Sequence, residues 1–235
     1  MKLFLDTADV DTVKKYWSTG LIDGLTTNPT LMMKAGQLPD KVYHDLKVLG
    51  IKDISMEVVA DNHADMLSEA RRLLGLFGDV VTIKVPCTVE GLLACRELSN
   101  QNVRVNVTLI FSAAQAILAA KAGATYVSPF VGRVDDNSFD GISLIQQIAS
   151  IYEKQFVHET QILSASLRNV KDVSKSFAAG AHICTIPPTV FAKMYQHVLT
   201  DKGLELFDND WKSVESLSQG VLTDPKENVI ININT

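Results

Sequence analysis

Short apolar runs alternate with longer amphipathic segments along most of the chain, from residue 2 to about residue 195. The apolar runs are rich in β-branched residues, which is typical of strands buried on both faces. We predict strands at residues 2–5, 23–27, 53–59, 80–86, 103–110, 125–130, 161–165 and 182–186. Since strands that alternate with helices form parallel sheets, the pattern predicts an α/β fold.

Helices are predicted between these strands, with Asp9 as the N-cap of the first and Ser112 as the N-cap of the helix after the fifth strand. Eight strand–helix alternations in about 200 residues indicate a single closed (β/α)8 TIM barrel. An open, doubly wound sheet is the alternative. It usually carries a glycine-rich phosphate loop after its first strand, and the sequence from Asp6 to Asp9 is not such a loop.

The chain continues beyond the eighth predicted strand. Further helical patterns cover about residues 189–195 and 204–217, and residues 229–234 alternate enough between apolar and polar to form a strand. We therefore expect a catalytic domain of residues 1–218, which includes an additional C-terminal helix, and a tail of residues 219–235.

Composition and charge exclude several classes of function. The 235-residue chain has a formal net charge of −5, so a general nucleic-acid or acidic-membrane surface is not expected, although a local basic pocket is compatible with it. No apolar run reaches the roughly 18–20 residues that span a bilayer, and no signal peptide is visible. Three cysteines without a disulfide framework predict a cytoplasmic protein. The five histidines lack metal-ligand spacing, so we expect no metal site.

Lys84 is the most informative residue, because it interrupts the apolar run at residues 80–86. Burial of an unpaired ammonium is costly, so such a group tends to lose its proton and become a nucleophile for a carbonyl carbon. Pro86 cannot donate to a sheet and is expected to end the strand, which leaves Lys84 near the rim. The alternative is a lysine that reaches from the strand end into water.

Polar side chains occur at the ends of the other predicted strands, where barrel enzymes carry their chemistry. They are Asp6, Asn28, Glu57, Asn106, Thr108, Ser128, Arg133, Ser166 and Arg168. Glu57 within an apolar strand needs a partner, which Lys84 on the next strand would supply, either for catalysis or as a structural ion pair. Asp6 could instead cap the first helix, and Asn28 before Pro29 could be a turn residue.

Two arginines predict a phosphate site. Arg133 and Arg168 follow the sixth and seventh strands, close to where barrels of this kind often hold a phosphate. Two guanidinium groups and the Ser166 hydroxyl would clamp a phosphate, whereas ordinary surface charges are the alternative.

Thr108 has an alternative interpretation as well, because threonine is an ordinary strand residue. The joint occurrence of these residues at one predicted mouth favours a functional site.

Seven motifs, in order along the chain, resemble those of the transaldolases, in particular the short, single-domain subfamily close to the fructose-6-phosphate aldolase branch. They are Leu5-Asp6-Thr7, Gly24-Leu25-Thr26-Thr27-Asn28-Pro29, Met56-Glu57-Val58, Ile83-Lys84-Val85-Pro86, Asn106-Val107-Thr108-Leu109-Ile110-Phe111-Ser112, Ser128-Pro129-Phe130-Val131-Gly132-Arg133 and Ala165-Ser166-Leu167-Arg168. The resemblance implies a cofactor-free (β/α)8 barrel that moves a dihydroxyacetone unit from a ketose phosphate to an aldose phosphate. Its usual reaction, in the non-oxidative pentose phosphate pathway, converts sedoheptulose 7-phosphate and glyceraldehyde 3-phosphate into erythrose 4-phosphate and fructose 6-phosphate.

The resemblance also implies roles for individual residues. By position, Lys84 matches the Schiff-base lysine and Asp6 the group that deprotonates the C4 hydroxyl. Glu57 and Thr108 match the pair that works through a water on carbinolamine dehydration and hydrolysis. The substrate-binding matches are Asn28, Asn106 and Ser128 for the dihydroxyacetone hydroxyls, Phe130 for a pocket wall, and Arg133, Ser166 and Arg168 for the phosphate.

Three functions are alternatives to the transfer of a dihydroxyacetone unit. The fructose-6-phosphate aldolase branch, which catalyses reversible aldol cleavage, has Gln at the position of Glu57 and Tyr at the position of Phe130, so this chain follows the transaldolase pattern. A sugar-phosphate sensor would be expected to lose Lys84 or Asp6, and both are present. A barrel isomerase would need a Glu–His pair, but His182 falls at the start of its strand, the wrong end.

The resemblance extends to assembly. It implies that chains of this length assemble into rings of five, often paired into decamers, in which the C-terminal helix reaches onto a neighbouring chain. We therefore expect sugar-phosphate substrates and a homo-oligomer, either a pentameric ring or a decamer, and we expect neither nucleic acid nor membrane as a partner.

Overall fold

The structure, a computed structural model, describes residues 1–221 and the side chains of residues 1–217. Its contacts divide the chain into one unit of Met1–Lys193 and a second that begins at Met194, so each unit is described by itself. The boundary that we predicted at residue 218 lies within the second unit and stays a prediction. The strand predicted at residues 229–234 lies outside the described residues.

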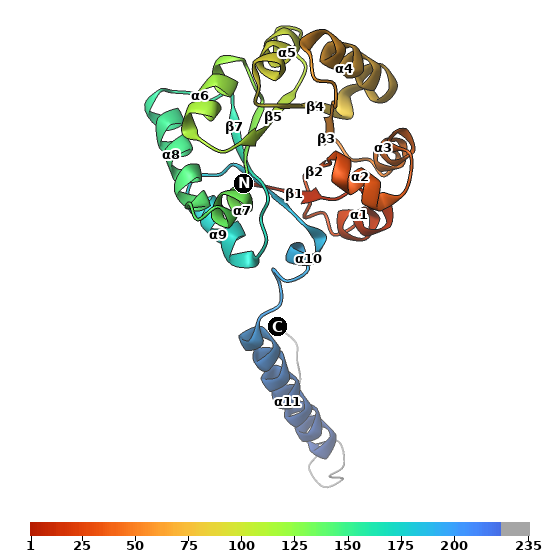
Figure 1. Ribbon diagram of the computed structural model, residues 1–235. Helices are drawn as coiled ribbons and strands as arrows, with labels where there is room; N and C mark the ends of the chain where they lie inside the picture. The colour runs from red at the N-terminus through yellow and green to blue at the C-terminus, as the bar shows by residue number, and fades with distance from the viewer. Residues whose placement is uncertain (222–235) are drawn as a thin grey trace, which may run out of the picture. The chain divides into compact units, whose positions relative to one another are not determined.

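Eight parallel strands form a closed barrel in chain order, which confirms the predicted (β/α)8 TIM barrel (Figure 1). The ring closes because β8 pairs with β1, with Leu3 opposite Cys184. The strands are β1 (Lys2–Asp6), β2 (Gly24–Thr26), β3 (Ile54–Glu57), β4 (Val81–Pro86), β5 (Val105–Ile110), β6 (Tyr126–Pro129), β7 (Gln161–Ser164) and β8 (Ile183–Ile186).

Helices surround the barrel of the first unit, and their caps follow the sequence. Asp9 and Ser112 accept hydrogen bonds from the backbone of the first turn of α1 and α6, which confirms both predicted N-caps. The helices are α1 (Val10–Trp17), α2 (Pro29–Ala35), α3 (Pro39–Val48), α4 (His63–Phe77), η1 (Gly78–Val80), α5 (Val89–Ser99), α6 (Ala113–Lys121), α7 (Val131–Asp136), α8 (Gly141–Lys154), α9 (Val170–Ala178) and α10 (Pro188–Phe191).

Three helices differ from the prediction, among them α10, which ends at Phe191 and not at the predicted residue 195. The short helix α7 was not predicted, because six residues give too little periodicity to be recognised. The second unit contains α11 (Val198–Val221), which begins earlier than the predicted residue 204. No helix within residues 1–221 is both long and apolar enough to cross a membrane.

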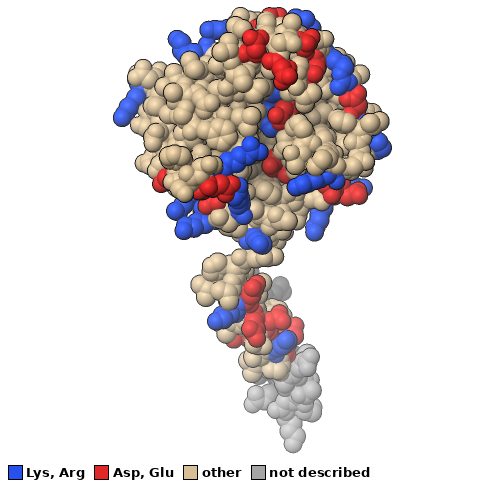
Figure 2. Space-filling model, viewed as in Figure 1, with Lys and Arg blue, Asp and Glu red and all other residues tan. Residues whose placement is uncertain are grey.

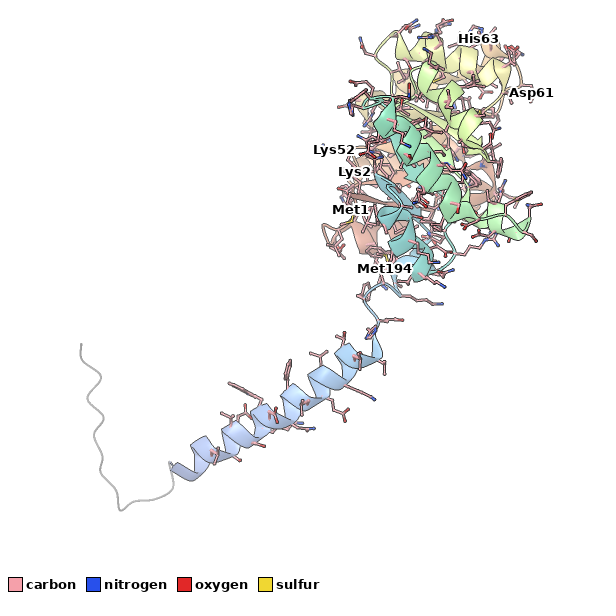
Figure 3. All side chains as sticks on the ribbon, turned by 90° about the vertical axis from the view of Figure 1, so that its left-hand side faces the viewer. Met1, Lys2, Lys52, Asp61, His63 and Met194 are labelled. Carbon is pink, nitrogen blue, oxygen red and sulfur yellow. The ribbon has the colours of Figure 1, made fainter. Side chains whose placement is uncertain are left out.

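The strands direct their carboxyl ends to one face of the barrel. Figure 3 shows Lys2, the first residue of β1, and Lys52, which precedes β3, on one side of this unit. Asp61 and His63, which follow β3, lie on the opposite side. Register then aligns the residues of neighbouring strands, so that Lys84 of β4 lies between Glu57 of β3 and Asn106 of β5. The parallel barrel therefore gathers residues that are far apart in the sequence.

Candidate active site

Lys84 is buried at the end of β4 with two oxygen atoms around its ammonium nitrogen. The residue is 5% exposed, and Nζ donates to Glu57 Oε2 at 2.9 Å and to the carbonyl oxygen of Thr27 at 3.0 Å. Lys84 therefore does not reach into bulk water, and this excludes the alternative interpretation of a lysine that extends from the strand end into solvent. The sequence offered only Glu57 as a polar partner for Lys84, whereas the structure adds the carbonyl oxygen of Thr27. The surroundings of the amine are therefore more polar than the apolar run of sequence predicted.

Asp6, at the end of β1, is the second carboxylate of the site. Its Oδ1 accepts a hydrogen bond of 2.7 Å from the hydroxyl of Thr26, which lies 2.6 Å from the hydroxyl of Thr185. Burial raises the pKa of Asp6, and this effect outweighs the hydrogen bond from Thr26 and the charge of Lys84, which lower it. Because Asp9 is the cap of α1, Asp6 is not needed as a helix cap.

A cavity of about 110 Å³, called here the mouth cavity, opens among the strand ends. Its lining contains eight of the eleven predicted site residues, together with Thr26, Ala165 and Thr185. Those eight are Asp6, Asn28, Lys84, Thr108, Ser128, Phe130, Arg133 and Ser166. Figure 2, which views the barrel along its axis, shows acidic and basic atoms in the hollow near the centre of this face.

Sequence reasoning missed three residues that line the mouth cavity, which are Thr26, Ala165 and Thr185. Thr26 and Thr185 are threonines within strands, where threonine is common, and this gives no functional signal by itself. The register would have found Thr26, because it lies opposite Asp6 in the pairing of β1 with β2.

Asn106 is fully buried behind the wall of the mouth cavity. Its Oδ1 accepts a 2.6 Å hydrogen bond from the Ser128 hydroxyl, and its Nδ2 donates to the Ser55 hydroxyl at 3.2 Å. Both ends of the amide are therefore engaged by the protein. In this arrangement Asn106 orients Ser128, which lines the cavity, while its predicted contact with substrate stays a prediction.

Thr108 offers a free polar atom to the mouth cavity. Its hydroxyl is buried and has no hydrogen-bond partner within the described part of the chain. A buried polar group left unsatisfied costs about 1–3 kcal/mol, so a water or substrate oxygen would stabilise it. The following residue, Leu109, has a φ of +59° at an irregularity in the pairing of β5 with β6, and such backbone strain clusters at functional sites.

Arg133 and Ser166 share one rim of the mouth cavity because α7 packs tightly on the loop after β7. The Gly132 backbone N–H donates to the Ser166 carbonyl at 3.1 Å, and a Cβ at Gly132 would lie only 2.3 Å from that oxygen. The Arg133 guanidinium lies over the Phe130 ring, with 4.9 Å between Cζ and the ring centre. Arg133 and Phe130, both predicted as site residues, thus contact each other.

Arg168 lies outside the lining of the mouth cavity. Both terminal nitrogens of its guanidinium donate to the carboxylate of Asp136 on α7, and this contact holds the pKa of Asp136 below its ordinary value. The sequence did not indicate this partner, since α7 was not predicted. Two of the five N–H donors of Arg168 are occupied, so others remain for a ligand.

Glu57 also lies outside the lining of the mouth cavity. It lines a second cavity of about 400 Å³, called here the side cavity, between α2, α3, α4 and the end of β3. The Lys84–Glu57 contact therefore joins the two cavities.

The site thus combines a buried primary amine, two carboxylates in different surroundings, several hydroxyl groups and an arginine at the rim. An amine of this kind can form an imine with a ketone, while carboxylates in different environments can hold different proton-transfer roles. Within residues 1–221, no group of three or more His, Cys, Asp or Glu side chains is arranged to hold a metal ion.

Comparisons with known proteins agree with one another. Residues 3–219 match the family model described as "Transaldolase/Fructose-6-phosphate aldolase". A "Probable transaldolase" of Paracoccus denitrificans (strain Pd 1222) is 49% identical over 211 residues, which cover 90% of this chain and 96% of that protein. Proteins of the same name from Erythrobacter litoralis (strain HTCC2594) and Nitrosopumilus maritimus (strain SCM1) are 48% and 47% identical, over 94% and 92% of this chain and 100% and 97% of theirs.

The raised pKa of Asp6 predicts a gain in stability when its charge is removed. As the pH rises above 3.8, the carboxyl of Asp6 ionises in the unfolded chain before it ionises in the folded protein, and this favours unfolding of the wild type. Asparagine keeps an acceptor for the Thr26 hydroxyl without carrying a charge. We expect Asp6→Asn to raise the free energy of unfolding at neutral pH, because it removes a charge that burial disfavours. Urea denaturation between about pH 4 and pH 8 measures this, and the gain should shrink toward the acid end. A variant less stable than the wild type at neutral pH would contradict the prediction.

Proposed function

The chain belongs to the transaldolase/fructose-6-phosphate aldolase family, and on this premise we propose that it is a transaldolase that acts through a lysine Schiff base. It would transfer a dihydroxyacetone unit from sedoheptulose 7-phosphate or fructose 6-phosphate to glyceraldehyde 3-phosphate or erythrose 4-phosphate, in the non-oxidative pentose phosphate pathway. The observation that carries the proposal is a buried amine, Lys84, that lines the mouth cavity with Asp6 and contacts Glu57 at 2.9 Å.

The first step joins the Lys84 nitrogen to C2 of the ketose. The amine must be neutral to attack, and Glu57 is close enough to accept the proton that it loses. Attack gives a carbinolamine, whose hydroxyl leaves as water when the C=N bond forms. The unpartnered hydroxyl of Thr108 lines the same cavity and can hold a water for this step.

The second step breaks the C3–C4 bond. The proton of the C4 hydroxyl leaves as the bond breaks, and the protonated imine takes up the electron pair to give an enamine. A carboxylate with a raised pKa suits this role, because it can accept the proton and return it to the acceptor aldose. Asp6, on β1, is separate from the Lys84–Glu57 pair, which supports different roles for the two carboxylates.

The rim of the mouth cavity would hold the phosphate. Arg133 and Ser166 both line it, and a guanidinium with a hydroxyl is a favourable set of phosphate donors. Arg168 follows Ser166 by two residues, and we propose that it binds the phosphate with the donors that Asp136 leaves open.

Reversible aldol cleavage of fructose 6-phosphate is the second candidate function, because the same family includes it. The enamine formed by Lys84 would then be released as dihydroxyacetone instead of being captured by an aldose. The Glu57 carboxylate, hydrogen-bonded to Lys84, favours transfer, since the cleavage branch carries Gln at this position.

We also propose that the protein forms a homo-oligomer, a pentameric ring or a decamer. Leu204, Phe207 and Trp211 of α11 are spaced three and four residues apart and are exposed. This spacing puts them on one face of the helix, and an exposed apolar face of this kind is typical of a contact between chains. The occupant that the family resemblance supports is a second copy of this chain.

Turnover and trapping test the proposed chemistry together. We expect the wild type to consume fructose 6-phosphate faster with erythrose 4-phosphate than without it, and borohydride to add a ketose-derived mass at Lys84. Lys84→Ala should abolish the adduct and lower both activities by at least a thousandfold, or about 4 kcal/mol. Lys52→Ala, at the opposite end of the barrel, is the matched control. Labelling of another lysine would refute the assignment of Lys84, whereas equal consumption with and without the acceptor would favour cleavage.

Removal of the arginines tests the phosphate site. We expect Arg133→Ala and Arg168→Ala each to lower kcat/KM for fructose 6-phosphate by at least tenfold, about 1.4 kcal/mol. Reaction of free dihydroxyacetone with an unphosphorylated aldehyde should change less than twofold. Arg71→Ala, which removes a guanidinium paired with Glu97 on the outer helices, is the control. Equal losses on phosphorylated and unphosphorylated substrates would count against the phosphate site.

Light scattering tests the assembly. Phe207→Asp and Trp211→Asp should lower the molar mass of the particle in solution, because a buried unpaired charge destabilises an apolar contact. Asn209→Asp adds the same charge on another face of α11 and should leave the mass unchanged. A monomeric wild type, or variants that keep the wild-type mass, would refute the proposal.

A further inference from the structure

Two cavities meet at the Lys84–Glu57 pair. Lys84 lines the mouth cavity and Glu57 lines the side cavity, while the two side chains are 2.9 Å apart. Asn28 lines both cavities. The side cavity is enclosed by α2, α3, α4 and the end of β3, which are neighbours around the barrel (Figure 1).

The proposed chemistry requires water to move at this pair, so the inference rests on the proposed function. One water leaves for each imine formed, because the oxygen of the C2 ketone departs as water when nitrogen takes its place. One water must return to hydrolyse the imine of the product ketose. The mouth cavity encloses only about 110 Å³, so a bound sugar phosphate leaves little space there for this exchange.

We propose that the side cavity is the route by which water leaves and reaches the Lys84–Glu57 pair while substrate fills the mouth cavity. Its volume of about 400 Å³ has room for several waters, and a water in a protein needs two to four polar partners. Glu57, Glu69, Arg72 and the hydroxyl of Tyr43 supply these partners.

The partition between the two cavities is thin. The Tyr43 hydroxyl lies 3.1 Å from the hydroxyl of Thr27, whose carbonyl oxygen accepts the hydrogen bond from Lys84. The Glu57 side chain keeps 18% of its surface exposed, although its Lys84 partner keeps 6%. Since Glu57 lines the side cavity and not the mouth cavity, the carboxylate meets water on the side that substrate does not occupy.

Substitutions in the wall of the side cavity can close this route without touching the mouth cavity. Val59 lines the side cavity and is 67% exposed, so Val59→Trp adds bulk there with little cost to folding. Leu73→Phe adds bulk from α4, on another wall. Val48→Trp is the matched control, because Val48 is equally exposed, at 71%, and ends α3 away from the cavity.

The test follows the oxygen of the ketone. Enzyme in excess is mixed with fructose 6-phosphate, without an acceptor aldose, in water enriched in oxygen-18, so that the imine forms and is hydrolysed again while the sugar fills the mouth cavity. Borohydride quenches the reaction and reduces the ketone, so that the C2 oxygen is held for mass spectrometry. A sample without enzyme gives the background exchange. When the route is open, expelled water mixes with the solvent and the recovered fructose 6-phosphate carries the label; when it is closed, the same water returns.

We expect nearly complete labelling of the recovered fructose 6-phosphate by the wild type and by Val48→Trp. Labelling at matched times should fall at least threefold in Val59→Trp and Leu73→Phe, while borohydride still adds a ketose-derived mass at Lys84 in both. Wild-type labelling in both variants, or an equal fall in the control, would overturn the proposed route. A wild type that neither labels fructose 6-phosphate nor forms an adduct at Lys84 would instead overturn the proposed function.

Discussion

The contact between Lys84 and Glu57 is the interaction on which the site depends. Transfer of two charged groups from water into a barrel is costly, and the attraction between them often fails to recover that cost. Such a pair is therefore weak support for stability, and a chemical role explains its position better. Lys84 of β4 donates to Glu57 of β3 and to the carbonyl of Thr27, which directly follows β2, so the nitrogen ties together the ends of three neighbouring segments.

Strand register and local backbone strain build the rest of the site around that nitrogen. Because β3, β4 and β5 are parallel and paired in register, Glu57, Lys84 and Asn106 lie side by side. Asn106 then fixes Ser128 on β6 through a buried hydrogen bond. The backbone is left-handed at Leu109, which follows the lining residue Thr108, and at Ser166, which itself lines the mouth cavity, so side-chain direction is set there at some conformational cost.

The two carboxylates of the site lie in different surroundings, and this separates their chemistry. Asp6 is buried beside hydroxyl groups of Thr26 and Thr185, and its pKa is raised. Glu57 contacts an ammonium and borders a second cavity. This difference fits the proposed mechanism, in which Asp6 would take the proton of the sugar hydroxyl and Glu57 would serve the protons and water of the imine.

The sequence by itself determined the barrel and most of the residues that line the mouth cavity, because strand–helix periodicity and polar residues at strand ends are local patterns. It also identified Glu57 as the partner of Lys84, since a buried charge within an apolar strand needs an opposite charge. Only the tertiary structure decided that Arg168 pairs with Asp136 and that Glu57 borders a second cavity. It also brought Thr26 and Thr185 to the mouth cavity. These outcomes depend on barrel closure, on the register of strands and on the short helix α7, and therefore on contacts between segments that no local pattern records.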